Sequence, residues 1–175
     1  MALIFSIYIE TGNLEQTRVI EQCFLNHGSI NWNGKEYQLQ SFTATDGCAI
    51  TPNGTSTTGI DTKEQCIEMS ELGLKLYDIL KSAPDFRFAL VGVEVDDFVE
   101  FNDLINEPEI NLDRTGLVIN RLIKHSSELY SNYEQFNETH YWTPYDGEQI
   151  IKSFIRNGKW KSEITWGYTE DHQKG

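Results

Sequence analysis

The sequence predicts an α+β domain in which helices pack on one face of a mainly antiparallel sheet. Three observations support this fold class: buried-strand patterns, apolar residues at helical spacing, and a composition suited to a packed core. Hydrophobic residues make up 39% of the 175 residues and only four prolines interrupt them, so the chain can bury its own core. This length is usual for one domain. We therefore expect a single globular domain over residues 1–168 and a frayed tail over 169–175.

The first elements read as a strand, a helix and a second strand. Residues 2–10 form a nearly continuous apolar run, which is typical of a strand buried on both faces. Asn13 is a suitable N-cap for the helix that follows, and Gly28 is a suitable residue to end it. Residues 35–45 carry the apolar spacing of a strand.

The next elements complete a pattern of strands and helices that is known from ferredoxin-like folds. Residues 46–60 are small, polar and rich in glycine, which predicts a loop with a short strand at 48–51. A capping box at 61–64 begins a long helix that Pro84 closes. Residues 86–95 then read as a buried strand. This order predicts a ferredoxin-like N-terminal half, with two helices on one face of an antiparallel sheet.

The second half of the chain is predicted to extend that sheet with further strands. Asp96 and Asp97 are suitable caps for a short helix that runs to about residue 106. The remaining predictions are a strand at 116–123, helices at 126–136 and 146–156, and a last strand at 160–166.

Negative charge is the most unusual bulk property of the chain. Fourteen Lys and Arg residues stand against 27 Asp and Glu residues, which gives a net charge of −13. Residues 85–113 hold nine of these acids and a single base, Arg87, so this segment carries most of the excess. Nucleic acids and anionic membranes repel such a surface, whereas a basic protein is attracted to it. Solubility is the alternative role of the charge, and the sequence leaves it open.

Cysteine and histidine usage indicates an intracellular protein without a metal or cofactor. Three cysteines with no CxxC spacing do not form a disulfide framework, which favours the reducing cytoplasm. The four histidines are scattered, with neither HxH nor HExxH. Asp96 and Asp97 resemble a Mg²⁺ ligand pair, but helix capping explains them more simply. The small residues of the 46–60 loop would let backbone amides approach an anion, and Cys48 would be an exposed thiol there. No Walker or GxGxxG spacing occurs, so a plain connection is favoured.

The stretch 94–109 is the first candidate site, because it holds seven acids and no base. Phe98, Phe101 and Leu104 would supply apolar anchors on its short helix. Aromatic anchors with a charged rim suit docking onto a basic protein, and a solvated helix face is the alternative. The predicted partner-binding residues are Glu94, Asp96, Asp97, Glu100 and Asp103, together with Trp142 and Tyr145.

The stretch 140–148 is the second candidate, since it crowds aromatic rings beside carboxylates. It suits a ligand-binding wall, with His140, Tyr145 and Asp146 as the residues of an alternative pocket and His140 as an acid–base partner. The competing interpretation is an aromatic strut that holds a proline-containing loop on the core, with Asp146 capping the next helix.

These observations favour a non-catalytic protein-binding module for a basic partner. In charge and size alone, the chain is similar to toxin-neutralising immunity proteins. The alternative is a small-molecule-binding domain or enzyme, whose pocket requires the 140–148 and 46–60 segments to converge. A structural or self-associating domain is a third possibility, and the oligomeric state stays open.

Overall fold

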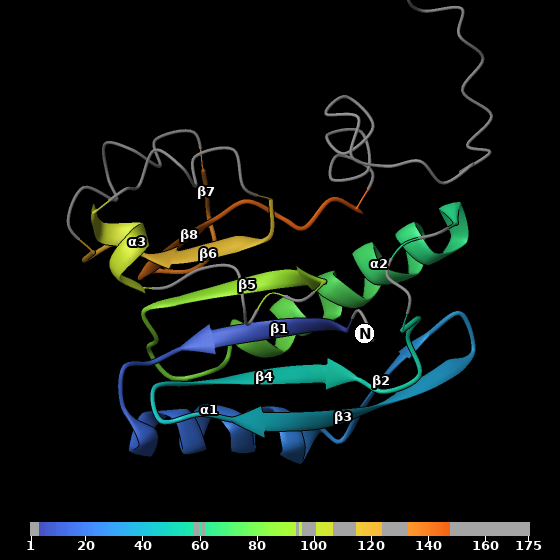
Figure 1. Cartoon of the computed structure of the whole chain (residues 1–175), viewed down its shortest axis with the longest axis horizontal. Coiled ribbons are helices and arrows are strands. Elements are labelled where there is room, and N and C mark those ends of the chain that lie inside the picture. Colours follow the sequence, from blue (N-terminus) through green and yellow to red (C-terminus); the bar gives the residue numbers. More distant parts are fainter. Residues whose placement is uncertain are drawn as a thin grey trace, which may run out of the picture.

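Eight strands form one antiparallel sheet in the computed structural model of this chain (Figure 1). The structure describes residues 4–57, 60, 62–93, 95, 101–106, 115–123 and 133–147. Along the sheet the strands follow the order β2-β3-β4-β1-β5-β6-β8-β7. The helices are α1 (Leu14–His27), α2 (Lys63–Leu80) and α3 (Phe101–Asn106). The strands are β1 (Phe5–Glu10), β2 (Ser29–Trp32), β3 (Lys35–Thr43), β4 (Gly47–Pro52), β5 (Phe88–Val93), β6 (Leu117–Asn120), β7 (Glu134–Gln135) and β8 (His140–Trp142).

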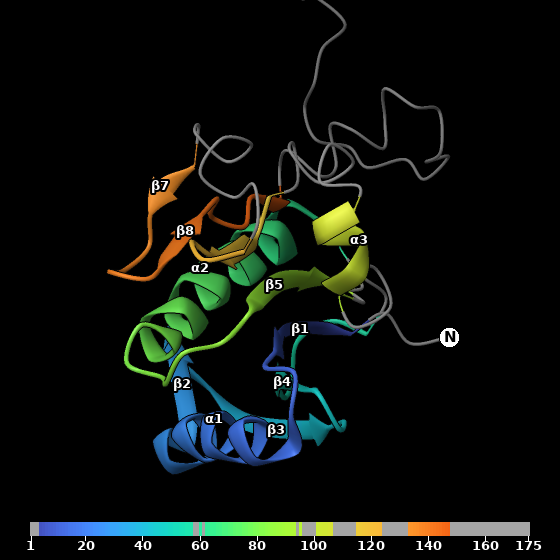
Figure 2. The same ribbon diagram turned by 90° about the vertical axis from the view of Figure 1, so that its left-hand side faces the viewer.

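The middle of this sheet confirms the predicted ferredoxin-like arrangement. Strands β3, β4, β1 and β5 are adjacent and antiparallel, and α1 and α2 cover the same face of them (Figure 2). Strand β2 continues the sheet at one edge, while β6, β8 and β7 continue it at the other. The α+β class and the extension by C-terminal strands are therefore as predicted.

Each face of the sheet carries its own apolar cluster, because successive side chains of a strand point to opposite faces. On the face of α1 and α2, Phe5, Ile7 and Ile9 of β1 are fully buried in the larger cluster. On the other face, Phe88 and Leu90 of β5 belong to a smaller cluster that includes α3. Because alternate residues of β5 belong to the two clusters, with Ala89 and Val91 in the larger one, this strand is apolar at successive positions.

The helix ends follow the predicted capping chemistry, with one shift in position. The Asn13 side chain accepts a hydrogen bond from the Gln16 backbone N–H, and Gly28 follows α1 with a φ of 80°. Helix α2 begins one residue later than predicted: Thr62 is the N-cap and forms the capping box with Gln65. The capping box therefore lies at residues 62–65 and not at 61–64. The Thr62 hydroxyl and the Gln65 side-chain amide satisfy the two backbone donors that the predicted box would have satisfied.

Three strands occur where the sequence predicted something else, and one of them, β8, lies in the stretch that was predicted as a proline-containing loop. Strand β2 was not predicted, since four residues between a helix end and a turn give too short a pattern to recognise. Asn33 and Gly34 join it to β3 with φ angles of 48° and 78°, as a two-residue hairpin turn requires. The predicted helix at 126–136 was wrong at its end, where β7 pairs with β8 instead.

Several predicted elements lie outside the described residues. These are the caps Asp96 and Asp97, residues 126–132 of the predicted helix, the helix at 146–156 beyond Gly147, and the strand at 160–166. None of the helices in the described ranges combines the length and hydrophobicity that crossing a membrane requires.

Candidate protein-binding surface around helix α3

Helix α3 lies on the face of the sheet opposite α1 and α2 (Figure 2). It contacts the sheet through Leu104, which is almost fully buried, and Phe101, which is half-buried against Phe88. The two apolar residues thus hold α3, the described helix of the acidic stretch 94–109, against the sheet. Of the predicted partner-binding acids, Asp103 lies within α3, whereas Glu94, Asp96, Asp97 and Glu100 are outside the described residues.

Arg87, the only base of residues 85–113, is engaged within the molecule. Its Nη1 lies 3.4 Å from Oε1 of Glu10, and its guanidinium carbon lies 4.4 Å from the centre of the Phe101 ring. The guanidinium therefore joins the end of β1 to α3 by an ion pair and a cation–π contact. Its charge offsets that of Glu10, which is not part of the acidic stretch.

Glu10 is a buried carboxyl group with only 5% of its surface exposed. The hydroxyl of Tyr8 donates to it over 2.9 Å. Burial raises the pKa of Glu10, while the hydrogen bond from Tyr8 and the charge of Arg87 act in the opposite direction. Burial also raises the pKa of Tyr8, and the Glu10 carboxyl adds to that effect. The Glu10 carboxyl is enclosed by Tyr8 and Arg87, so it is suited to holding β1 and α3 together.

A hollow of about 390 Å³ lies beside α3. Its apolar lining includes Phe101, Ile105 and Leu122, and Leu122 is 87% exposed. Asp85 and Arg87 form a charged part of the lining. An exposed apolar wall beside charged groups is the anatomy of a protein-binding hot spot with its rim.

Trp142 and Tyr145, the aromatic members of the predicted surface, lie on the other face of the sheet from α3. The Trp142 ring packs edge-on against Tyr77 of α2, with 4.9 Å between the ring centres. The predicted surface therefore does not form as one patch among the described residues. Trp142 and Tyr145 are separated from α3 by the sheet itself.

Tyr145 forms an aromatic strut, as the alternative interpretation of this stretch proposed. Only 4% of it is exposed, and its ring centre lies 5.5 Å from that of Phe5. The ring fits among Gly73, Gly92 and Gly116, where an added Cβ would lie within 4 Å of it. Its hydroxyl is buried and has no hydrogen-bond partner among the described residues, and burial raises its pKa. This side chain is inaccessible to a partner or ligand.

His140 is likewise buried and hydrogen-bonded. Its Nδ1 contacts the Thr139 hydroxyl at 2.8 Å and the side-chain Oδ1 of Asn137 at 3.1 Å. Its Nε2 lies 2.9 Å from the backbone carbonyl oxygen of Phe86. Burial lowers its pKa, against the opposing effects of the Phe86 carbonyl and of the Asp85 carboxylate. The neutral ring is therefore favoured, which suits a structural role. Asp146, the third residue of the predicted pocket, is exposed.

The 46–60 segment contains the short strand that was predicted at 48–51. Its residues 47–52 form β4, which lies between β3 and β1 near the middle of the sheet. Cys48 is fully buried there, and burial raises the pKa of its thiol to about 12, so the expectation of an exposed thiol was wrong. Strands β4 and β8 are four positions apart in the sheet, a separation of about 19 Å at the usual strand spacing. The end of the 46–60 segment nevertheless meets the 140–148 stretch, since a Cβ added at Gly147 would lie 3.4 Å from Cδ1 of Ile60. Both residues are buried, so this meeting point is a packed contact.

No cluster of three or more His, Cys, Asp or Glu side chains suited to a metal ion occurs in the part of the chain that the structure describes. The features that the sequence interpretation missed are the hollow beside α3 and the exposed Leu122. The sequence did contain a signal for the hollow. Arg87 is a single base in a long acidic stretch, and such a residue commonly has a partner within the molecule. Leu122 falls beyond β6, where the strand pattern still predicted burial.

Comparison with known proteins identifies no relative: no protein-family model, no curated protein and no solved structure matches this chain.

Proposed function

We propose that this chain is a non-catalytic, cytoplasmic protein-binding domain that takes a basic protein on the surface around α3. A single observation carries the proposal: seven acids and no base occupy residues 94–109, in a segment that α3 anchors to the sheet through Phe101 and Leu104. The anchoring matters because it ties the acidic stretch to one face of the fold.

The hollow beside α3 supports the proposal by offering an apolar contact next to the charge. Electrostatic attraction mainly accelerates encounter and selects partners, whereas apolar anchors in a desolvated pocket supply most of the affinity. Ile105 and Leu122 are suited to receive such an anchor, because they line the hollow next to α3. A basic segment that carries one large apolar side chain is the partner chemistry that fits both features.

The state of the buried titratable groups favours a binding role over catalysis. Glu10 and His140 are the described carboxyl and imidazole groups with shifted pKa values, and both are committed to internal hydrogen bonds. The three cysteines form no disulfide within the described part of the chain, in keeping with a reducing compartment. A basic toxin is one partner of this kind, which accords with the similarity in charge and size to immunity proteins.

The proposal is tested by charge reversal in the acidic stretch. Partners are captured by cross-linking from cells that express the tagged chain, purified, and measured for affinity between about 50 mM and about 300 mM salt. We expect a basic partner whose affinity falls steeply with salt. The triple variant Asp96→Lys, Asp97→Lys and Glu100→Lys is expected to weaken its binding at least about tenfold.

The matched control makes the same change of charge at exposed acids elsewhere, with Glu71→Lys, Glu134→Lys and Glu138→Lys. This control is expected to change the affinity by less than about threefold, because the substituted residues lie outside the acidic stretch. Equal losses from the two triple variants, or partners whose binding does not respond to salt, would refute the proposal.

A further inference from the structure

Strand β2 has one edge that pairs with β3 and one edge that pairs with no strand among the described residues. The Leu39 backbone N–H donates to the Gly28 carbonyl oxygen over 2.9 Å, so the backbone of Gly28 points toward β3. In an antiparallel pair the hydrogen-bonding direction alternates along the strand, so Ile30 turns its backbone groups to β3. The N–H and C=O groups of Ser29 and Asn31 therefore point to the open edge.

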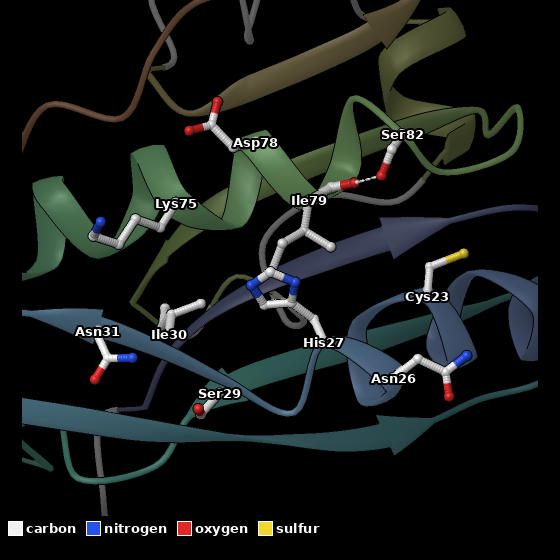
Figure 3. A pocket seen from close by; sticks show the side chains of 10 residues that line it. All are labelled: Cys23, Asn26, His27, Ser29, Ile30, Asn31, Lys75, Asp78, Ile79 and Ser82. Carbon is white, nitrogen blue, oxygen red and sulfur yellow. Dashed lines mark hydrogen bonds between the residues drawn. The ribbon is translucent and has the colours of Figure 1, made fainter.

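This open edge faces helix α2 across a cleft of about 620 Å³. Figure 3 shows β2 lying between β3 and α2, with the His27 ring and the Ile79 side chain directed toward each other in the cleft. Side chains from three elements line it, among them Cys23 and His27 of α1, Ile30 and Asn31 of β2, and Lys75 and Ile79 of α2. The volume lies in the range of ligand-binding clefts, roughly 300–1,000 Å³.

The lining combines an apolar floor with polar groups that are free to bind. Ile30 and Ile79 are buried, and they give the cleft its floor. His27, Asn31 and Lys75 make no side-chain hydrogen bond or ion pair within the described parts of the chain. Asp78 points away from the His27 ring in Figure 3, and its carboxylate pairs with Lys81 at 3.1 Å. The Lys75 ammonium is thus a cation without an internal partner in a chain of strongly negative charge.

We infer that this cleft binds an extended peptide segment, which adds to β2 as a further strand and places a carboxylate against Lys75. The unpaired backbone groups of Ser29 and Asn31 supply the main-chain hydrogen bonds of strand addition. The neighbouring helix supplies contacts for alternate side chains, because the peptide would lie along the open edge of β2 and beside α2. The Lys75 ammonium supplies the preference for an acidic side chain of the peptide.

A single peptide strand fits this edge better than a second copy of the chain does. Helix α2 runs close beside the open edge, with Cα atoms of the two elements within 8 Å of each other, so a broad partner surface would meet the helix before it reached the edge. Two copies also repel each other, since each carries a net charge of −13. The cleft lies on the side of α1 and α2, away from α3, and its function is independent of the one proposed above.

The inference is tested with three libraries of linear heptapeptides that differ only in the central residue, which is Asp, Lys or Ala. The full chain is expected to select the Asp-centred library. The selected peptides are then measured for affinity, and Lys75→Gln is expected to weaken them about tenfold. Lys63→Gln is the matched control, because Lys63 is an exposed lysine at the start of the same helix and is outside the cleft.

A second variant tests the strand addition itself. Asn31→Pro removes an N–H that points to the open edge and leaves the β2–β3 ladder intact, a position where edge strands tolerate proline. It is expected to abolish peptide binding while the melting temperature stays close to that of the unaltered chain. Should the variant fail to fold, two methylated peptides provide the same test on the unaltered protein. One is methylated at every odd-numbered backbone nitrogen and the other at every even-numbered one. One of these two peptides is expected to lose binding.

Several results would overturn the inference. In the selection, these are the absence of binding from all three libraries or a preference for the Lys-centred library. Among the variants, they are equal effects of Lys75→Gln and Lys63→Gln, or unchanged binding by a folded Asn31→Pro variant. Unchanged binding of both methylated peptides would count in the same way. Dimerisation in light scattering that Asn31→Pro removes would instead assign the edge to a second copy. The acidic-stretch triple variant must retain peptide binding, so a failure at α3 and a failure at β2 are distinguished.

Discussion

The imidazole of His140 stacks on the ring of Phe86, with 3.9 Å between the ring centres and 20° between the planes. The same histidine bonds the Phe86 carbonyl through Nε2, so one residue of β8 holds both the backbone and the side chain of the segment before β5. Protonation of a buried ring is unfavourable, and burial accordingly lowers the pKa of His140.

This arrangement predicts a pH-dependent stability. Because the pKa of His140 is lower in the folded chain than its ordinary value of 6.5, the unfolded chain takes up a proton first as the pH falls. We expect the free energy of unfolding to decrease between about pH 7.5 and about pH 5.5, and the His140→Gln variant to lack this contribution. Urea unfolding at several pH values measures it, and parallel curves for the two proteins would contradict the prediction.

Glu10 is expected to show the opposite sign. Burial raises the pKa of this carboxyl, so the folded chain holds the proton more tightly than the unfolded chain does. Its contribution to stability is greatest below the ordinary pKa of 4.5 and is lost as the pH rises through the folded value. Glu10→Gln keeps an acceptor for the Tyr8 hydroxyl and removes this dependence. Relative to the variant, the unaltered chain should therefore lose unfolding free energy between about pH 4 and about pH 7; a constant difference would disprove the assignment.

Gly116 is predicted to be intolerant of a side chain. Its φ is +92°, and an added Cβ would lie 2.3 Å from the Val91 carbonyl oxygen. Gly116→Ala should lower the free energy of unfolding by more than about 2 kcal/mol, because both the backbone conformation and the contact are strained. Gly34→Ala is the control: its φ is +78° but nothing lies within 4 Å, so only about 1 kcal/mol should be lost. Chemical denaturation compares the two variants, which should differ clearly.

Tyr145 is predicted to stabilise the fold through its ring and not through its hydroxyl. The hydroxyl is buried and has no hydrogen-bond partner in the described part of the chain, so Tyr145→Phe should leave the stability unchanged or raise it by up to about 1 kcal/mol. Tyr145→Ala removes the ring that contacts Phe5 and should cost about 3–5 kcal/mol. A large loss from the phenylalanine variant, measured by urea unfolding, would show that the hydroxyl has a partner in solution.

Thr62 is predicted to be the residue that begins α2. Its hydroxyl accepts from the Gln65 backbone N–H, and the Gln65 side chain accepts from the Thr62 backbone N–H. Thr62→Ala should lower the melting temperature and cost about 1 kcal/mol, whereas Thr62→Ser retains the acceptor and should cost little. Equal melting temperatures for the alanine and serine variants would argue against this cap.

Local patterns were sufficient for most of the fold, because they depend on neighbouring residues. Asn13 and Gly28 identify the ends of α1, and the apolar runs identify β1 and β5. The failures are also local. Strand β2 has too few residues for a pattern, and β7 exists only because it pairs with β8. A strand of two residues has no preference of its own that a sequence can display.

The candidate site was less predictable than the fold, since its parts come from distant segments. The charge of the 94–109 stretch is visible in the sequence, but its attachment to the sheet depends on the contacts of Phe101 and Leu104. The aromatic residues Trp142 and Tyr145 looked equally suitable for a surface, and the strand order placed them against α2 instead.

The sequence by itself determined the α+β class, the order of the main elements and the concentration of negative charge in one stretch. Hydrophobic periodicity, capping residues and charge are properties of contiguous residues, so no contact with the rest of the chain is required to recognise them. Only the tertiary structure decided which face of the sheet each aromatic side chain occupies, and that an open strand edge faces α2 across a cleft. These relations depend on strand pairing between residues far apart in the chain, whose register is set by the packing of the whole core.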